Sequence, residues 1–150
     1  MDLPDIRTLV PHAGPMVLLD RVLSADAENL CAEVRIRRDS LFCLDGVVGS
    51  WVGIEYMAQT IGAWAGYTAR LRGEPIKRGF LLGTRRYECL RPFFPVGMLL
   101  RVHVQRLLEG ANGLASFACR IEDESGVIAS ANLSVLQSAD PAECSEQGSA

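Results

Sequence analysis

The chain has 150 residues, of which 49% are hydrophobic and 22% charged, and its formal net charge is −3 at pH 7. This composition is typical of one globular domain and excludes a disordered, collagen-like or disulfide-stapled chain. The slight negative charge gives no reason to expect a nucleic-acid partner. The five cysteines include no CxxC pair, so we expect reduced thiols, no disulfide framework and a cytoplasmic protein. Residues 1–7 carry charges and precede no apolar stretch, so no signal peptide is expected.

The first third of the chain predicts two strands and a loop. A short helical turn is expected from Asp5 to before Pro11, and the apolar, branched residues 16–22 predict a strand. Residues 30–37 alternate between apolar and largely charged side chains, which is typical of a half-buried strand. Residues 39–50 then predict a loop, with Asp45-Gly46 as its turn signal.

One long helix is predicted over residues 51–72, where apolar side chains recur at spacings of three and four. Ser50 precedes it at an N-cap position, and Gly73 and Pro75 supply the stop. At ~1.5 Å per residue the helix is about 33 Å long. Its apolar surface exceeds half its circumference, so other elements are expected to wrap it. Its longest uncharged run, residues 56–69, is too short to span a bilayer.

Strands follow one another after the helix, at residues 79–90, 100–105, 115–121 and 127–136. Turn-rich links between the later strands favour hairpins and therefore an antiparallel sheet. Two strands, a long helix and four strands predict an α+β domain in which an antiparallel β-sheet wraps around a long central α-helix. We expect this single domain to span residues 1–138. Residues 139–150 are rich in Ser, Ala, Glu and Pro and predict a disordered tail.

Glu55 is the first candidate for chemistry. On a helical wheel it lies at the edge of the apolar stripe, in line with Gly62 and Gly66. Glycine is unfavourable in a helix, so these two positions suggest that something packs very close along that face. A carboxyl group in such a half-apolar setting can serve as a general acid. The alternative is a solvated glutamate that suits the helix dipole.

The two histidines, His12 and His103, are far apart and lack metal-ligand spacing, so no metal site is expected. His103 falls on the polar face of an alternating strand, which favours a surface role. His12 lies in a turn-rich segment, where an ordinary loop histidine is expected. The basic pairs at 77–78 and 85–86 predict a solvated surface, with the docking of an acidic partner as the alternative.

Three segments together resemble motifs of the FabZ-type 3-hydroxyacyl-[acyl carrier protein] dehydratases, which have the hotdog fold. They are residues 9–22 (LVPHAGPMVLLDRV), residues 53–59 (GIEYMAQ, with an acidic residue before Met-Ala-Gln) and residues 91–97 (RPFFPVG). The three matches follow the family's order and span most of residues 8–105. The sequences at 51–59 and 79–87 are more similar to the dehydratase-like subgroup encoded with aryl polyene pathways.

The resemblance implies a hotdog homodimer, or a heterodimer with a related hotdog subunit, that acts on an acyl thioester carried by an acyl carrier protein. It implies that Glu55, on the facing subunit's helix, protonates the leaving hydroxyl at C3. Backbone N–H groups around Val48, Gly49 and Ser50 would polarise the thioester carbonyl, and Gln59 of the helix motif would contact the substrate. The elimination is redox-neutral, so neither a cofactor nor a metal is expected.

The loop before the helix departs from the family's pattern. Residues 41–50 are shorter and contain no histidine, whereas the family has a His-Phe-Pro-Gly type segment there. The general base that takes the C2 proton is therefore open among Asp45, Cys43 and His12. Three hypotheses follow: a dehydratase that forms trans-2-enoyl thioesters, a non-catalytic subunit of a heterodimeric dehydratase, or a hotdog thioesterase in which Glu55 or Asp45 activates water.

Overall fold

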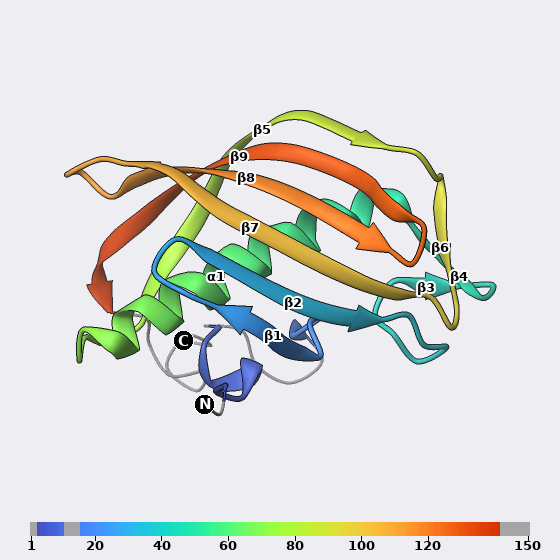
Figure 1. The fold of residues 1–150 in the computed structure, drawn as a ribbon, viewed down its shortest axis with the longest axis horizontal. Helices are drawn as coiled ribbons and strands as arrows, with labels where there is room; N and C mark the ends of the chain where they lie inside the picture. The colour runs from blue at the N-terminus through green and yellow to red at the C-terminus, as the bar shows by residue number, and fades with distance from the viewer. Residues whose placement is uncertain (1–2, 11–15, 142–150) are drawn as a thin grey trace, which may run out of the picture.

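A computed structural model describes residues 3–10 and 16–141 and shows one long helix lying in the hollow of a curved sheet (Figure 1). The sheet has six strands in the order β1-β2-β7-β8-β9-β5, and every neighbouring pair is antiparallel. The strands are β1 (Arg21–Ala25), β2 (Asn29–Arg35), β5 (Lys77–Cys89), β7 (Leu99–Glu109), β8 (Leu114–Asp123) and β9 (Gly126–Pro141). The predicted α+β class and the antiparallel sheet around one helix are confirmed.

The long helix begins as one 3-10 turn, η3 (Ser50–Val52), and continues directly as α1 (Gly53–Leu71). It ends where Gly73 adopts a φ of +68°, a conformation in which glycine carries no steric cost. The apolar stripe that the sequence predicts faces the concave side of the sheet. Trp64, for example, contacts Phe117 of β8 edge to face, with the ring centroids 5.2 Å apart.

The prediction that Ser50 caps the helix is wrong. Gly49 occupies the cap position of the first turn, and no side chain of residues 3–10 or 16–141 caps the turn there. Ser50 lies inside the turn, and its N–H donates to the carbonyl of Pro92 at 2.9 Å. The start of the helix is therefore held by a distant segment of backbone instead of by its own capping side chain.

The predicted loop before the helix contains a short hairpin instead. Its strands are β3 (Cys43–Leu44) and β4 (Val47–Gly49), and β6 (Phe93–Pro95) completes a three-stranded sheet. Asp45 and Gly46 have φ values of 54° and 79°. Positive φ at both central residues is the signature of a two-residue type I′ turn, so the turn signal itself is confirmed. Figure 1 shows this small sheet at the end of the large sheet where the helix begins.

The N-terminal segment differs from its prediction. The short turn is confirmed as η1 (Ile6–Thr8), where the Asp5 side chain accepts a hydrogen bond from the N–H of Arg7. The strand expected from residue 16 begins only at Arg21, because the backbone of Met16 and Leu18 bonds to a helix side chain and not to another strand. At the other end of the chain, β9 continues to Pro141 and so includes the first three residues of the expected tail.

Candidate active site

Glu55 lies in the first turn of α1 and is half-buried. Its carboxylate oxygen Oε1 accepts a hydrogen bond from the Gln59 side-chain nitrogen, Nε2, at 3.3 Å. The two residues are four apart, a spacing that puts both side chains on the same face of a helix. The carboxyl group that the sequence singled out is therefore oriented by a neighbour one turn further along.

Both polar atoms of the Gln59 side-chain amide form hydrogen bonds with the backbone. It is 1% exposed, its oxygen Oε1 accepts from the Leu18 N–H at 2.9 Å, and Nε2 donates to the Met16 carbonyl at 2.7 Å. These bonds tie residues 16–18 to the flank of the helix and leave Nε2 directed at Glu55. The geometry gives Gln59 a positioning role, while its contact with substrate stays a prediction.

Close packing along the Glu55 face is confirmed at Gly66. A Cβ placed there would collide with the carbonyl oxygen of Leu9, so only glycine admits the backbone of the N-terminal segment. The segment that packs against the helix at Gly66 is therefore the N-terminal part of the same chain. Leu9 at one end and residues 16–18 at the other lie along the same helix face that carries Glu55.

The N–H groups around Val48, Gly49 and Ser50, predicted to bind the thioester carbonyl, are not all free to do so in the structure. Val48 is buried and pairs with Phe94 in the small sheet, and the indole of Trp51 lies so close over Gly49 that a Cβ there would collide with it. The Ser50 N–H is already bonded to the Pro92 carbonyl. The next N–H is that of Trp51, in the first turn, where helix N–H groups have no carbonyl one turn back. The sequence pattern missed Trp51, although the same rule about helix ends indicates it.

The structure does not bring all the candidate bases to Glu55. Asp45 is exposed in the β3–β4 turn, and its positive φ accounts for an aspartate at that position. Cys43 is a half-buried free thiol at the start of β3. His12 lies outside the described residues. The identity of the base stays a prediction.

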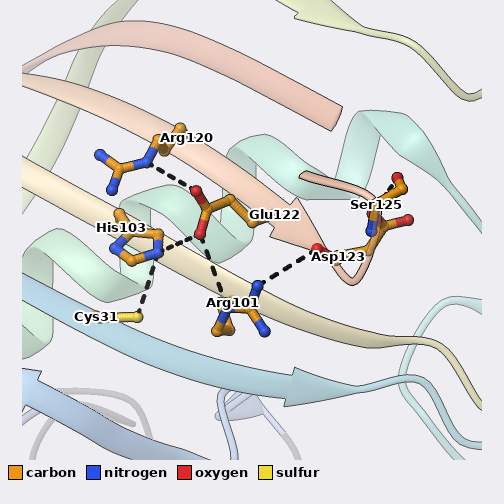
Figure 2. Close-up of polar contacts among 7 residues, drawn as sticks. All are labelled: Cys31, Arg101, His103, Arg120, Glu122, Asp123 and Ser125. Atoms are coloured by element: carbon orange, nitrogen blue, oxygen red, sulfur yellow. Dashed lines mark hydrogen bonds and ion pairs between the residues drawn. The ribbon is translucent and has the colours of Figure 1, made fainter. Parts of the chain in front are cut away.

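A second polar cluster lies on the opposite face of the large sheet (Figure 2). The ring nitrogen Nε2 of His103 is 2.8 Å from Glu122 Oε1 and 3.7 Å from the Cys31 sulfur, and Arg101 and Arg120 pair with the same carboxylate. This placement agrees with the surface role expected for His103. Burial, together with the nearby Arg120, lowers the pKa of His103.

This cluster does not have the geometry of a thiol nucleophile with its base. In a nucleophilic triad the histidine uses one nitrogen for the nucleophile and the other for the carboxylate, whereas here Nε2 faces both Cys31 and Glu122. Burial also raises the pKa of Cys31 to about 11, so the thiol stays protonated. Among residues 3–10 and 16–141, no group of His, Cys, Asp and Glu is arranged to hold a metal ion.

A curved antiparallel sheet wrapped around one central helix defines a hotdog-fold protein. The family model for ApeP-like proteins, described as ApeP dehydratase, matches residues 4–146. The chain belongs to the ApeP-like dehydratase family. Within the described part of the chain, no helix has the length and apolar character needed to cross a membrane.

Individual relatives agree with this assignment. The chain is 30% identical to a chain of the dehydratase heterocomplex ApeI:P from Xenorhabdus doucetiae, with a TM-score of 0.85 over 91% of this chain and 93% of that one. It is 27% identical over 142 residues to a 3-hydroxyacyl-[acyl-carrier-protein] dehydratase FabZ from Bartonella quintana, covering 91% of this chain and 89% of the relative. A hypothetical thioesterase with coenzyme A from Streptococcus pneumoniae shares only the fold, at 10% identity and a TM-score of 0.63 over 81% and 87% of the two chains.

Proposed function

We propose that the chain removes water from 3-hydroxyacyl thioesters carried by an acyl carrier protein and forms trans-2-enoyl thioesters. The observation that carries this proposal is the position of Glu55, half-buried and held by Gln59 in the first turn of a long helix. Within one chain, Glu55 follows Trp51 by four residues, roughly one helical turn, ~5.4 Å along the axis. A thioester carbonyl at the Trp51 N–H would then direct its C3 hydroxyl toward Glu55.

In this reaction Glu55 is the general acid. The carbonyl oxygen gains partial negative charge while the C2–H bond breaks, and the positive end of the helix dipole stabilises that charge. The C2 proton passes to the general base, and the electron pair of that bond becomes the C2–C3 double bond. The C3–O bond breaks as the Glu55 proton moves to the leaving oxygen, which departs as water. No electron is gained or lost, so no redox cofactor or metal enters the balance.

We propose His12 as the general base in preference to Asp45. The described residues on either side of the segment that contains His12 contact the helix face of Glu55, Leu9 at Gly66 and Met16 at Gln59. Asp45 lies at the exposed tip of a turn. An imidazole also titrates near neutral pH, which suits a base that must accept and return a proton in each cycle.

We further propose that the chain acts next to a second hotdog subunit, with the acyl carrier protein as its substrate-bearing partner in the cytoplasm. Around the helix N-terminus the side chains of Leu44, Trp51 and Phe93 are 73%, 63% and 53% exposed. Phe42 contacts Trp51, and Gly49 pairs with Phe93, so these groups form one apolar patch beside the proposed site. Exposed apolar patches of this kind mark protein interfaces. The likeness to a chain of a dehydratase heterocomplex supports a related hotdog protein as the partner.

The test is turnover of a 3-hydroxyacyl thioester on acyl carrier protein, followed by enoyl absorbance, with the chain alone and mixed with a related hotdog dehydratase. We expect Glu55→Gln to lower kcat by at least ~100-fold, within the range general acid catalysis contributes. Glu74→Gln is the matched control, because Glu74 is exposed beyond the far end of the same helix. A Glu55→Gln variant with the wild-type rate would refute the acid assignment.

Two other outcomes decide between the hypotheses. Turnover that requires the second subunit and is insensitive to Glu55→Gln identifies a non-catalytic partner subunit. Release of free thiol without enoyl product identifies a thioesterase. Either result rejects the proposed elimination at Glu55.

A further inference from the structure

Tyr87 reaches the start of the helix from the edge strand of the sheet. Its hydroxyl donates a hydrogen bond to the carbonyl oxygen of Ser50 at 2.5 Å. Tyr87 is half-buried and packs against the core beside this bond. The two residues are 37 positions apart in the sequence, so this contact exists only in the folded chain.

A β-bulge turns Tyr87 toward the helix. Between Arg85, opposite Asn132, and Glu88, opposite Ser130, β5 has one residue more than β9. Arg86, inside the bulge, has a φ of 55°, which costs a non-glycine residue conformational energy. Because side chains alternate along a strand, one extra residue exchanges the faces of those that follow. The strained bulge is therefore what directs the Tyr87 side chain inward.

The helix makes room for the hydroxyl at Gly53. A Cβ at this position would collide with the Tyr87 hydroxyl oxygen. Glycine inside a helix is less favourable than alanine by about 1 kcal/mol. The bulge in β5 and the glycine in the helix are each locally unfavourable, and both are needed for the hydrogen bond from Tyr87 to Ser50.

The Ser50 carbonyl belongs to the same peptide group as the Trp51 N–H. A donor on the carbonyl oxygen polarises that group, and hydrogen bonds in such chains strengthen one another. The Ser50 N–H on the preceding peptide is bonded to Pro92. Outside its own turn, the Trp51 N–H makes no hydrogen bond with the described residues. Tyr87 therefore acts on the one amide that the proposed function assigns to the thioester carbonyl.

Tyr87 keeps its proton in this position. Burial raises the pKa of its hydroxyl above the ordinary value for tyrosine. It remains a neutral donor throughout the pH range in which the protein would work, and the Ser50 carbonyl can only accept. The direction of the hydrogen-bond chain, from Tyr87 through the peptide to Trp51 and outward, is thus fixed.

We propose that Tyr87 is a positioning residue of the dehydratase site, which orients and polarises the Ser50–Trp51 peptide so that the Trp51 N–H binds the thioester carbonyl of the substrate. This rests on the function proposed above. Tyr87 touches no reacting atom; its effect reaches the substrate through one peptide group. The alternative is that Tyr87 only anchors the end of the helix.

The experiment compares Tyr87→Phe with the wild type, each with the partner subunit if turnover requires it. Loss of one direct oxyanion donor lowers kcat by about 100- to 1000-fold. Tyr87 acts one group further away, so we expect kcat to fall about tenfold with KM changed less than about twofold. Tyr67→Phe is the matched control, since Tyr67 is half-buried on α1 and its hydroxyl has no hydrogen bond among the described residues.

Infrared spectroscopy distinguishes polarisation of the Ser50–Trp51 peptide from simple anchoring of the helix end. The substrate 3-hydroxyacyl thioester is bound to Glu55→Gln and to the double variant with Tyr87→Phe, and its carbonyl stretch is recorded by difference infrared spectroscopy. We expect a shift to lower frequency in Glu55→Gln and a smaller shift in the double variant. Equal shifts, or a Tyr87→Phe kcat equal to that of the wild type, would overturn the inference while leaving the proposed function intact.

Gly53→Ala keeps the test decisive if Tyr87→Phe fails to fold. The methyl group added to the helix displaces the Tyr87 hydroxyl from the Ser50 carbonyl. Alanine is also a better helix former than glycine, so this variant is expected to fold. We expect the same fall in kcat, and an unchanged kcat would overturn the inference. If the wild type forms no enoyl product under any condition, the proposed function fails, and the inference fails with it.

Discussion

Replacing Gln59 with leucine tests whether this side chain holds the N-terminal segment on the helix. Leucine has a similar volume but can neither accept from the Leu18 N–H nor donate to the Met16 carbonyl. The half-buried Leu18 N–H would lose its partner, at a cost of about 1–3 kcal/mol. Met16 is 51% exposed, so water can replace its partner and the cost there is about 0–1 kcal/mol. We expect Gln59→Leu to lower the free energy of unfolding by about 2–3 kcal/mol.

Thermal and urea unfolding measure this loss. For a chain of this size the expected fall in Tm is roughly 4–12 °C. Thr60→Val is the matched control, because Thr60 is also buried on α1 and, among the described residues, its hydroxyl bonds only to the Tyr56 carbonyl, which keeps its helical partner. That control should cost less than about 1 kcal/mol. Wild-type stability in Gln59→Leu, with amide exchange at Leu18 unchanged, would refute the reasoning.

Two further predictions concern stability. The pKa of His103 is lowered in the folded protein, so folding favours the neutral imidazole. Neutral His103 therefore contributes to stability at pH values above its unfolded pKa near 6.5, and this contribution is lost as the pH falls through its folded pKa. Unfolding curves between pH 7 and pH 5 should therefore show a smaller loss of stability in His103→Asn than in the wild type, and parallel losses would contradict this. Gly66→Ala should lower stability by about 1–3 kcal/mol, since the Leu9 backbone must move; calorimetry that finds no loss would show that this contact is not tight.

The parts of the fold that could be predicted are those written in long local patterns. The helix has 19 residues in α1 alone, with a continuous apolar stripe and Gly73 as its stop, so periodicity defines it almost to the residue. Strands β2, β7 and β8 alternate over 7 to 11 residues, and their predicted positions are confirmed. Each of these elements depends mainly on which of its own faces is apolar.

The parts that could not be predicted depend on partners distant in the sequence. Residues 16–20 look like a strand by composition, but the backbone of Met16 and Leu18 is held by Gln59, 41 to 43 positions away. Strands β3 and β4 have two and three residues, too few to show a period. Ser50 has the right chemistry for a cap, yet Pro92 and Tyr87 bind its backbone from across the fold.

The same distinction holds for the candidate site. Glu55 could be singled out because its helix position is determined by local spacing, and the Gly66 contact follows from the same spacing. Tyr87 could not, because a one-residue bulge in β5 decides which way it points. Sequence patterns place a side chain on a helix or strand, whereas the register between distant strands determines which side chains contact one another.

The most direct test of the account is the structure of the Glu55→Gln variant with a 3-hydroxyacyl thioester bound, determined together with any partner subunit that turnover requires. We predict the thioester carbonyl at hydrogen-bond distance from the Trp51 N–H and the C3 hydroxyl at hydrogen-bond distance from the side chain at position 55. An acyl group bound away from the first turn of the helix, with position 55 facing only solvent or protein, would contradict the proposed chemistry.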